Sequence, residues 1–352
     1  MPGKVPVRAG GDGTLPVPGW DDNYIWTGFI PFEKLPMVFN PTQGFIVTAN
    51  NPQVRAQDYP YFLGLDQDRG QRAERITEMI QNNPDKISID DMVAIQTDNQ
   101  ELGGLEIISN LSNITFDKPE VAAARDRMIN WDGEMYLDRP EAALFAFYWS
   151  HLLAGTFHDQ LPLDLYPYGN HFDLDIITSL EAKPNDLWWD DITTPDIKEN
   201  RDVIIKKAFE QAYAEGVAKL GTDFGKWRWG DIHQITFRNA TLGKSGIGFI
   251  ENIFNRGPFP VNGSETVVQK TCWNVNEDYS AKCIPALRQI LDLGNLGSSR
   301  MIHSVGQSGH PMHPHYDDFI ILWRNFQYHP SNWERLVVET SNPDTLVLLP
   351  GK

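Results

Sequence analysis

The sequence predicts an α+β protein in which a helical block lies between two β-rich segments. Short apolar runs that end at glycine or proline dominate residues 1–60, and apolar residues at helical spacing dominate residues 61–225. Short apolar runs return over residues 226–352. Strands, then helices, then strands favour a sheet layer that the chain enters twice, with helices inserted between the two visits. We therefore divide the chain into three predicted segments at these boundaries.

Each element follows from a local pattern. Apolar runs bounded by Gly, Pro or Asn predict strands, whereas apolar residues spaced three and four apart predict helices. The sequence Ser88-Ile-Asp-Asp is a capping box at the start of one helix. The first segment has predicted strands at 5–8, 25–31 and 44–49; the helices are predicted at 70–81, 88–95, 122–130, 141–153, 172–180 and 201–220; the last segment has strands at 234–238, 266–269, 299–305, 335–339 and 345–349.

The charge balance excludes several classes of partner. The 352 residues carry 30 Lys and Arg against 47 Asp and Glu, a formal net charge of −17, and they form no dense basic patch. Nucleic-acid binding and docking on anionic lipid both need a basic surface, so neither partner is expected. No apolar run approaches the length of a membrane span, and residues 1–8 lack the apolar core of a signal peptide.

The two cysteines, Cys272 and Cys283, are too few for a disulfide framework, and their spacing matches no zinc motif. They form either one bridge in an oxidising compartment or two small buried residues, and composition leaves both open. His310, His313 and His315 form a second cluster of metal-ligand types. Prolines between them prevent a helix, so we expect loop hydrogen bonds or packing, with a polar pair between His315 and Asp317, rather than a metal site.

The residues from Gly44 to Asn51 contain the candidate catalytic group of this sequence. The apolar run before Ala49 predicts a buried strand, and two carboxamides, Asn50 and Asn51, follow at its end. An Asn in that place can direct its NH₂ group at a developing negative charge, as an oxyanion-hole donor does. The alternative is a simple turn, because Asn-Asn-Pro is common turn chemistry.

Seven sequence motifs together resemble the penicillin acylase family. They occur in the family's order from about residue 5 to residue 330, and several motifs in order are far more specific than one. The motifs span 10–20 (GGDGTLPVPGW), 26–31 (WTGFIP), 40–51 (NPTQGFIVTANN), 71–76 (QRAERI), 227–233 (WRWGDIH), 255–263 (NRGPFPVNG) and 306–318 (GQSGHPMHPHYDD).

The resemblance implies an N-terminal-nucleophile hydrolase with an α/β/β/α sandwich, incomplete in this chain and matured by self-cleavage. In this family a new N-terminal Ser attacks a linear amide that is not a peptide bond, and its own α-amine acts as the base. An α-amine titrates near pH 8, so a useful neutral fraction exists at physiological pH. Acyl-homoserine lactones and the acyl side chains of β-lactams are substrates of the family.

Two catalytic residues are implied by position. Asn50 matches the side-chain donor of the family's oxyanion hole, and a neutral carboxamide suits that role beside an amine base. Arg75, in the Ala-Glu-Arg-Ile motif, matches the family's active-site arginine. Arg72 lies three residues earlier on the same predicted helix face and is the alternative. The substrate-binding residues are left open.

The resemblance also implies parts outside this chain. The family's nucleophile lies upstream of the first motif, and neither Met1 nor Pro2 can serve, so we expect the missing N-terminal part of the large chain and the small chain as partners. Relatives are often exported. This chain alone is expected to be inactive, and the alternative is a non-catalytic remnant that binds a partner.

No cofactor is required for this chemistry, but some members of the family bind calcium near the subunit junction. The resemblance places one carbonyl ligand near Gly13, and Asp66 and Asp68 are the nearest carboxylates, in a loop of different length. Two tryptophan-rich stretches, at 188–189 and 227–229, either line an acyl pocket or pack in the core, and core packing is the default.

Overall fold

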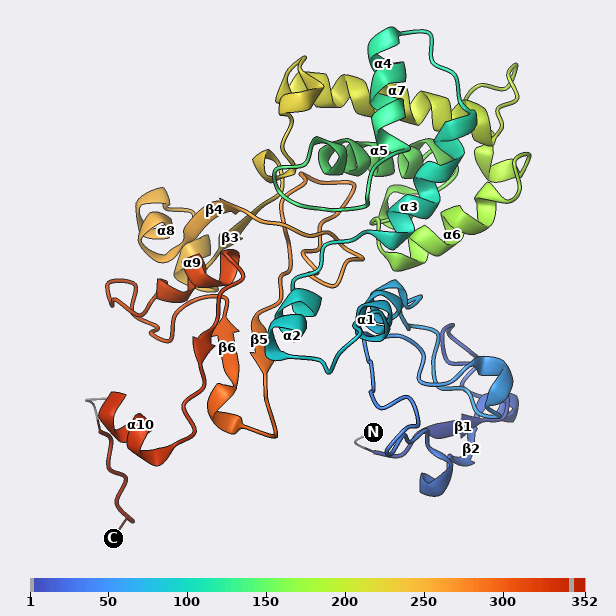
Figure 1. Ribbon diagram of the computed structural model, residues 1–352. Helices are drawn as coiled ribbons and strands as arrows, with labels where there is room; N and C mark the ends of the chain where they lie inside the picture. Colours follow the sequence, from blue (N-terminus) through green and yellow to red (C-terminus); the bar gives the residue numbers. More distant parts are fainter. Residues whose placement is uncertain (1–2, 342–344, 352) are drawn as a thin grey trace. The chain divides into compact units, whose positions relative to one another are not determined.

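The structure is a computed structural model that describes residues 3–341 and 345–351, and it divides into two compact units, Met1–Thr77 and Glu78–Lys352. Figure 1 shows the ribbon. The helices are α1 (Gln71–Gln81), α2 (Ile89–Gln96), α3 (Leu102–Ile108), α4 (Pro119–Met128), α5 (Pro140–Phe157), α6 (His171–Glu181), α7 (Arg201–Leu220), α8 (Gly248–Phe254), α9 (Asp318–Arg324) and α10 (Arg335–Ser341). The strands are β1 (Pro6–Arg8), β2 (Trp26–Phe29), β3 (Gln234–Phe237), β4 (Arg256–Pro260), β5 (Leu287–Ile290), β6 (Arg300–His303) and β7 (His329–Pro330).

The first unit is built mainly of loops. Its sheet is the antiparallel pair β1–β2, in which Pro6 lies opposite Phe29, with an irregularity in register after Val7. Among its described hydrophobic residues only Ile30 and Ala49 are buried. The many Gly and Pro residues of this region explain the scarcity of regular structure, because they favour turns and remove ladder hydrogen bonds. The described part of this unit therefore has very little core of its own.

The second unit has a large helical core, visible as the group of helices α3 to α7 in Figure 1. Helix α5 is apolar on nearly every side and packs along α7, as expected for a helix that is buried all round. Trp189, Trp227 and Trp229 are fully buried in the same core. The core-packing interpretation of the tryptophan-rich stretches is thus confirmed.

A smaller core lies among the strands of the second unit. The pair β3–β4 and the three-stranded sheet β5–β6–β7 are both antiparallel. Ile302 on β6 and Trp323 on α9 are buried together with Ile235 on β3. This cluster joins β3, β6 and α9 by apolar burial. Such burial contributes roughly 25 cal/mol of folding free energy per Å² of apolar area removed from water.

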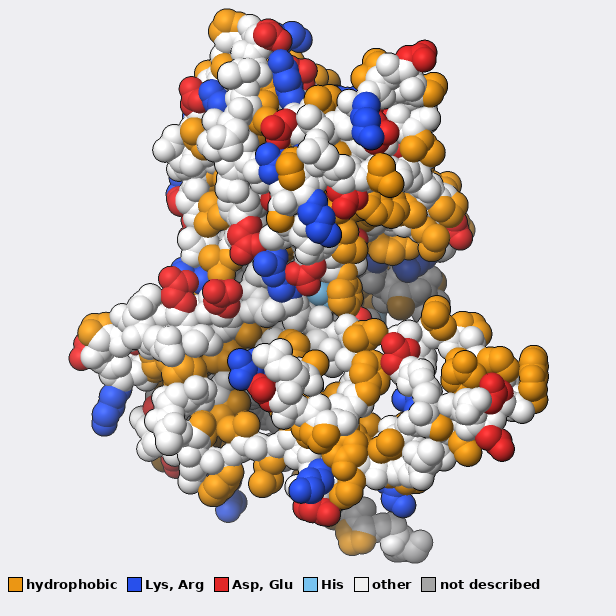
Figure 2. Space-filling view, turned by 90° about the vertical axis from the view of Figure 1, so that its right-hand side faces the viewer, with side chains coloured by type: hydrophobic (Ala, Val, Ile, Leu, Met, Phe, Trp, Pro, Cys, Tyr) orange, Lys and Arg blue, Asp and Glu red, His pale blue; other side chains and the backbone are white. Residues whose placement is uncertain are grey.

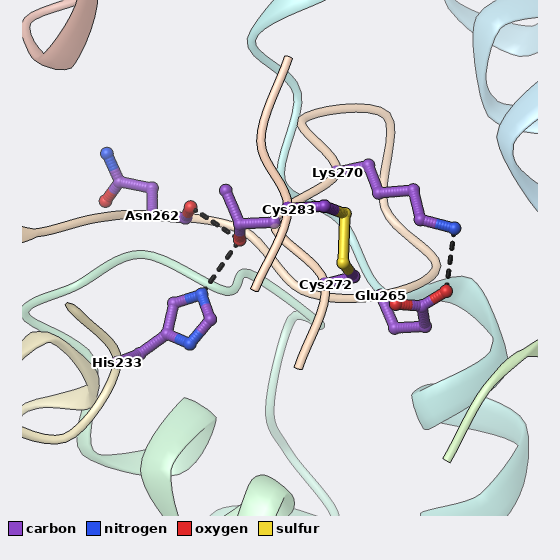
Figure 3. The surroundings of a disulfide bond; sticks show 7 residues. His233, Asn262, Glu265, Lys270, Cys272 and Cys283 are labelled. Atoms are coloured by element: carbon purple, nitrogen blue, oxygen red, sulfur yellow. Dashed lines mark hydrogen bonds and ion pairs between the residues drawn. A yellow bond between two sulfur atoms is a disulfide. The ribbon is translucent and has the colours of Figure 1, made fainter. Parts of the chain in front are cut away.

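The two cysteines, whose state the sequence left open, form a disulfide in the structure. Figure 3 shows Cys272 joined to Cys283, with a Cα–Cα distance of 5.1 Å. Nearby, the buried ring of His233 contacts the Thr271 hydroxyl at 2.9 Å, and that hydroxyl donates to the carbonyl oxygen of Asn262 at 3.0 Å. Lys270 pairs with Glu265 at 2.7 Å. The bridge closes a short loop in a densely hydrogen-bonded part of the second unit.

The predicted α+β class with an inserted helical block is confirmed, because α1 to α7 lie between β2 and β3. All six predicted helices form, and the capping box at Ser88 is present. The strands predicted at 5–8, 25–31, 234–238 and 299–305 form as well. The three-segment division at residues 60 and 225 stays a prediction.

Four predicted strands are wrong, and so is the single sheet layer entered twice. The described strands form three separate small sheets. Residues 45–48 are irregular and pair with no described strand. Residues 266–269 lie next to a single isolated bridge, and residues 345–349 are irregular. Residues 335–339 are helical, with an ion pair between Arg335 and Glu339 one turn apart. An apolar run becomes a strand only where another strand is available to pair with it.

None of the helices in the described part of the chain combines the length and the apolar character that a membrane crossing requires.

The contact between α7 and Trp227 generates a prediction for stability. A Cβ added at Gly216 would lie 2.0 Å from the buried Trp227 ring, whereas a Cβ at Gly248 on α8 would meet nothing within 4 Å. We expect Gly216→Ala to lower the free energy of unfolding by about 1–3 kcal/mol through overpacking. Gly248→Ala should change it by under about 0.5 kcal/mol, as exposed substitutions do. Urea unfolding followed by tryptophan fluorescence measures both, and equal values would contradict the packing.

Candidate functional site

Asn50 lies in a bend of the chain that follows the irregular segment 45–48. Its backbone is left-handed, with φ of 65°, a conformation that Asn adopts more readily than most residues. The Asn51 side-chain oxygen accepts a hydrogen bond from the Ala49 N–H at 3.0 Å, which closes the turn. The chain therefore bends at the two carboxamides, and the Asn50 side chain is exposed to solvent, while its role as a donor stays a prediction.

The guanidinium of Arg72, on the first turn of α1, holds the Asn50 side chain. Its Nη2 atom donates to Asn50 Oδ1 at 2.8 Å and to the Ala49 carbonyl oxygen at 3.0 Å. A guanidinium can only donate, so the oxygen end of the carboxamide must face Arg72. The NH₂ end consequently points away, and it donates to no other described residue. This is the orientation that an oxyanion donor requires.

Asp68 forms an ion pair with Arg72. The sequence indicates Asp68 only as a possible calcium ligand. Its Oδ2 atom pairs with Arg72 Nη2 at 2.9 Å, and its side chain is only 4% exposed, compared with 14% for Arg72. Its backbone N–H donates to the Asn50 carbonyl oxygen at 2.9 Å. The available signal was an acidic residue shortly before a predicted helix, four positions ahead of Arg72, where a carboxylate can reach the first turn.

The contact with Asn50 comes from Arg72, the alternative that the sequence left open. Arg75 is half-buried one turn further along α1. Its catalytic role stays a prediction.

The carboxylate of Asp68 fits a calcium site poorly. Oxygen ligands of calcium must be free to face the ion, but Asp68 Oδ2 faces a guanidinium and Oδ1 accepts from the Gly70 N–H at 3.0 Å. Asp66 is exposed. Among the residues that the structure describes, no cluster of three or more His, Cys, Asp or Glu side chains has metal-binding geometry.

The histidine cluster makes loop hydrogen bonds, as predicted. His310 Nδ1 accepts from the Met312 N–H at 3.2 Å, and His313 Nδ1 accepts from the His315 N–H at 3.1 Å. The predicted pair of His315 with Asp317 is wrong. His315 instead contacts Asp318 at 2.8 Å, because Asp317 pairs with Arg256 across the loop.

The most perturbed carboxyl groups lie elsewhere, in the second unit. Burial raises the pKa of Glu101 to about 7, against the opposing effect of hydrogen bonds from the Thr266 and Ser264 hydroxyls. Burial likewise raises the pKa of Glu181 to about 8. Perturbed pKa values cluster at functional sites, but structural burial produces them too. Glu101 is 2% exposed, and the cavity that it lines with Phe145 and Trp149 has room for about one water molecule, so we assign it to the core.

Comparisons with known proteins place these residues in a family context. A family model described as penicillin amidase matches residues 1–340. The acyl-homoserine lactone acylase QuiP of Pseudomonas aeruginosa is 28% identical, over 95% of this chain and 43% of that protein. The penicillin acylase 2 proenzyme of Pseudomonas sp. strain SE83 is 28% identical, over 98% of this chain and 44% of that protein. The chain therefore spans less than half the length of these relatives.

A solved structure shares the fold. A thermostable penicillin G acylase from Alcaligenes faecalis superimposes with a TM-score of 0.60 and 17% identity, over 99% of this chain and 64% of that chain. The predicted class of N-terminal-nucleophile hydrolase fold is thereby confirmed. The identity is too low to transfer residue roles, so the roles of Asn50 and Arg72 rest on their own geometry.

The assignment of Glu101 to the core predicts a pH dependence of stability. Its pKa is raised in the folded protein, so folding favours the protonated form, and this contribution is complete below about pH 4.5 and is lost as pH rises through 7. Glu101→Gln removes the titration. The parent should lose about 1–3 kcal/mol more of its free energy of unfolding than the variant when the pH is raised from 5 to 8. Urea unfolding at both pH values measures this.

The matched control is Glu334→Gln, which neutralises an exposed carboxylate. It should leave the difference between the two pH values unchanged. If Glu101→Gln also leaves that difference unchanged, Glu101 is ionised in the folded protein and the burial argument is wrong.

Proposed function

This chain belongs to the penicillin amidase family, and we propose that it forms part of an amidohydrolase that cleaves linear, non-peptide amides through an acyl-enzyme. The observation that carries the proposal is the orientation of Asn50: Arg72 holds its oxygen at 2.8 Å, which leaves the NH₂ group available to a substrate. A neutral donor in that place stabilises the oxyanion of a tetrahedral intermediate.

The nucleophile in this proposal is an N-terminal Ser delivered by a segment outside these 352 residues. Its hydroxyl attacks the amide carbonyl while its α-amine takes the proton, and the carbonyl oxygen gains charge next to Asn50. As the intermediate collapses, the protonated α-amine gives its proton to the leaving nitrogen, the amine departs and an ester remains, which water then hydrolyses with the α-amine again as the base. The contribution of this chain is to position Asn50, with Arg72 setting the direction of the carboxamide. The predicted role of Arg75 is to orient other polar groups around the site.

The substrate class follows from the relatives, which are an acyl-homoserine lactone acylase and a penicillin acylase by name. Both kinds of substrate join a carboxylic acyl group to an amine through an amide. We therefore propose an N-acyl amide as the substrate of the assembled protein.

The proposed partner is the remainder of the acylase, and the surface of the first unit supports it. Trp20 is 90% exposed and Phe32 is 84% exposed, and Met37 and Phe39 are also largely exposed. Figure 2 shows that exposed hydrophobic side chains gather in patches on the face it presents. Large exposed apolar patches usually mark an interface.

The catalytic proposal predicts the effect of removing the donor. Asn50→Gly deletes the carboxamide and accommodates the left-handed backbone, so it should lower kcat by about 10²–10³ with little change in fold. The assay uses this chain assembled with the segment that carries the nucleophile and a chromogenic phenylacetyl or fatty-acyl amide.

Asn40→Gly is the matched control, since Asn40 also has a positive φ, of 44°, and is exposed. It should keep full activity. Full activity of Asn50→Gly would remove the assigned role, and an assembly with no amidase activity at all would favour the non-catalytic remnant.

The partner proposal predicts the behaviour of the isolated chain. Without its partner, the exposed apolar residues of the first unit should cause self-association and binding of a hydrophobic dye. Addition of the complementary segment should reduce both. Analytical ultracentrifugation gives the association state, and a monodisperse monomer that ignores the segment would contradict the proposal.

A further inference from the structure

Asp68 connects the candidate donor to the start of α1 through more than one bond. Its Oδ2 atom pairs with Arg72 at 2.9 Å, and its Oδ1 atom accepts from the Gly70 N–H at 3.0 Å. Its own N–H donates to the carbonyl oxygen of Asn50 at 2.9 Å. Asp68 therefore contacts both the backbone of Asn50 and the side chain that orients Asn50.

The carboxylate also supplies the counter-charge that Arg72 needs. The Arg72 side chain is 14% exposed, and its Nε atom has no hydrogen-bond partner among the described residues. A guanidinium that is mostly removed from water is strongly destabilised when its carboxylate is lost. Without Asp68, the Arg72 guanidinium would have only the neutral oxygens of Ala49 and Asn50 as acceptors. Its free energy would then be lower when the side chain turns to solvent.

The direction of the Asn50 carboxamide depends on that cation. The oxygen and nitrogen ends of a carboxamide have nearly the same shape, so only hydrogen bonding decides which end faces which group. If Arg72 left its place, the Asn50 side chain would populate both orientations, and only one of them presents the NH₂ group outward.

We propose that Asp68 is a positioning residue, which holds Arg72 against Asn50 and so keeps the oxyanion donor pointing toward the substrate. This inference rests on the proposed function. Asp68 does not touch the substrate, and it acts on the rate through Arg72. A donor already aligned before the reaction stabilises the transition state without a reorganisation cost.

Kinetic measurements on the assembled protein test the inference. Asp68→Asn keeps the shape of the side chain and removes its charge, so kcat should fall about 10- to 100-fold while KM stays within about twofold, because the donor acts on the transition state. Asp68→Glu keeps the charge and should recover part of the loss. In an Arg72→Gln background, Asp68→Asn should add little further loss, since coupled residues are not additive.

Asp66→Asn is the matched control, because it removes an identical charge two residues away on an exposed side chain. It should retain kcat. If both Asp variants lose activity equally and added calcium restores it, the two carboxylates serve a cation and the inference is overturned. It is also overturned if Asp68→Asn keeps full kcat while Asn50→Gly is inactive, and in that case the proposed function stands.

A readout without activity separates failure of the inference from failure of the proposed function. In the 352-residue chain, nitrogen-15 NMR of arginine side chains should show slow rotation of the Arg72 guanidinium, because its Nη2 is held by oxygens of Ala49, Asn50 and Asp68. Asp68→Asn should release that rotation, and Asp66→Asn should not. Unchanged slow rotation in Asp68→Asn overturns the inference whether or not the assembled protein hydrolyses amides.

Discussion

The geometry of the candidate site depends on a single guanidinium group. Arg72 Nη2 is shared among a backbone carbonyl oxygen, a carboxamide oxygen and a carboxylate, all within 3.0 Å. These acceptors come from the turn at residues 49–50 and from the residues just before α1. The local chain has little apolar burial to define its conformation, so directional, charge-assisted hydrogen bonds take over that function.

The second unit is organised differently from the candidate site. There, α5, α7 and the tryptophans of the core define positions by close packing, and the large pKa shifts of Glu101 and Glu181 are consequences of burial. In the first unit, hydrogen bonds and an ion pair define the positions of the candidate site residues, of which Asp68 is buried and Asn50 is exposed. The shifted pKa values of Glu101 and Glu181 therefore mark the core of the second unit, because desolvation is greatest in a buried core.

This chain is similar to an acyl-homoserine lactone acylase and a penicillin acylase. Both relatives are more than twice as long as the stretch that matches this chain. In the assembly that we propose, each segment has to present its group in a fixed direction. The exposed apolar side chains near Trp20 and Phe32 agree with such an arrangement, since an interface must be apolar where it is buried.

The sequence by itself determined six of the helices, the resemblance to the family and the position of the oxyanion candidate, but it predicted none of α3, α8, α9 and α10. Helical periodicity and caps are local, which is why α1, α2 and α4 to α7 could be predicted, and the order of the motifs identified the family. Tertiary structure decided the rest. Residues 45–48 have no strand to pair with, residues 335–339 coil into α10, and Cys272 meets Cys283. Tertiary structure also showed that Arg72 contacts Asn50. The two residues are 22 positions apart in the sequence, and only folding brings Arg72 Nη2 to 2.8 Å from Asn50 Oδ1. Pairing, contact and orientation depend on which distant groups come together, and no local pattern contains that information.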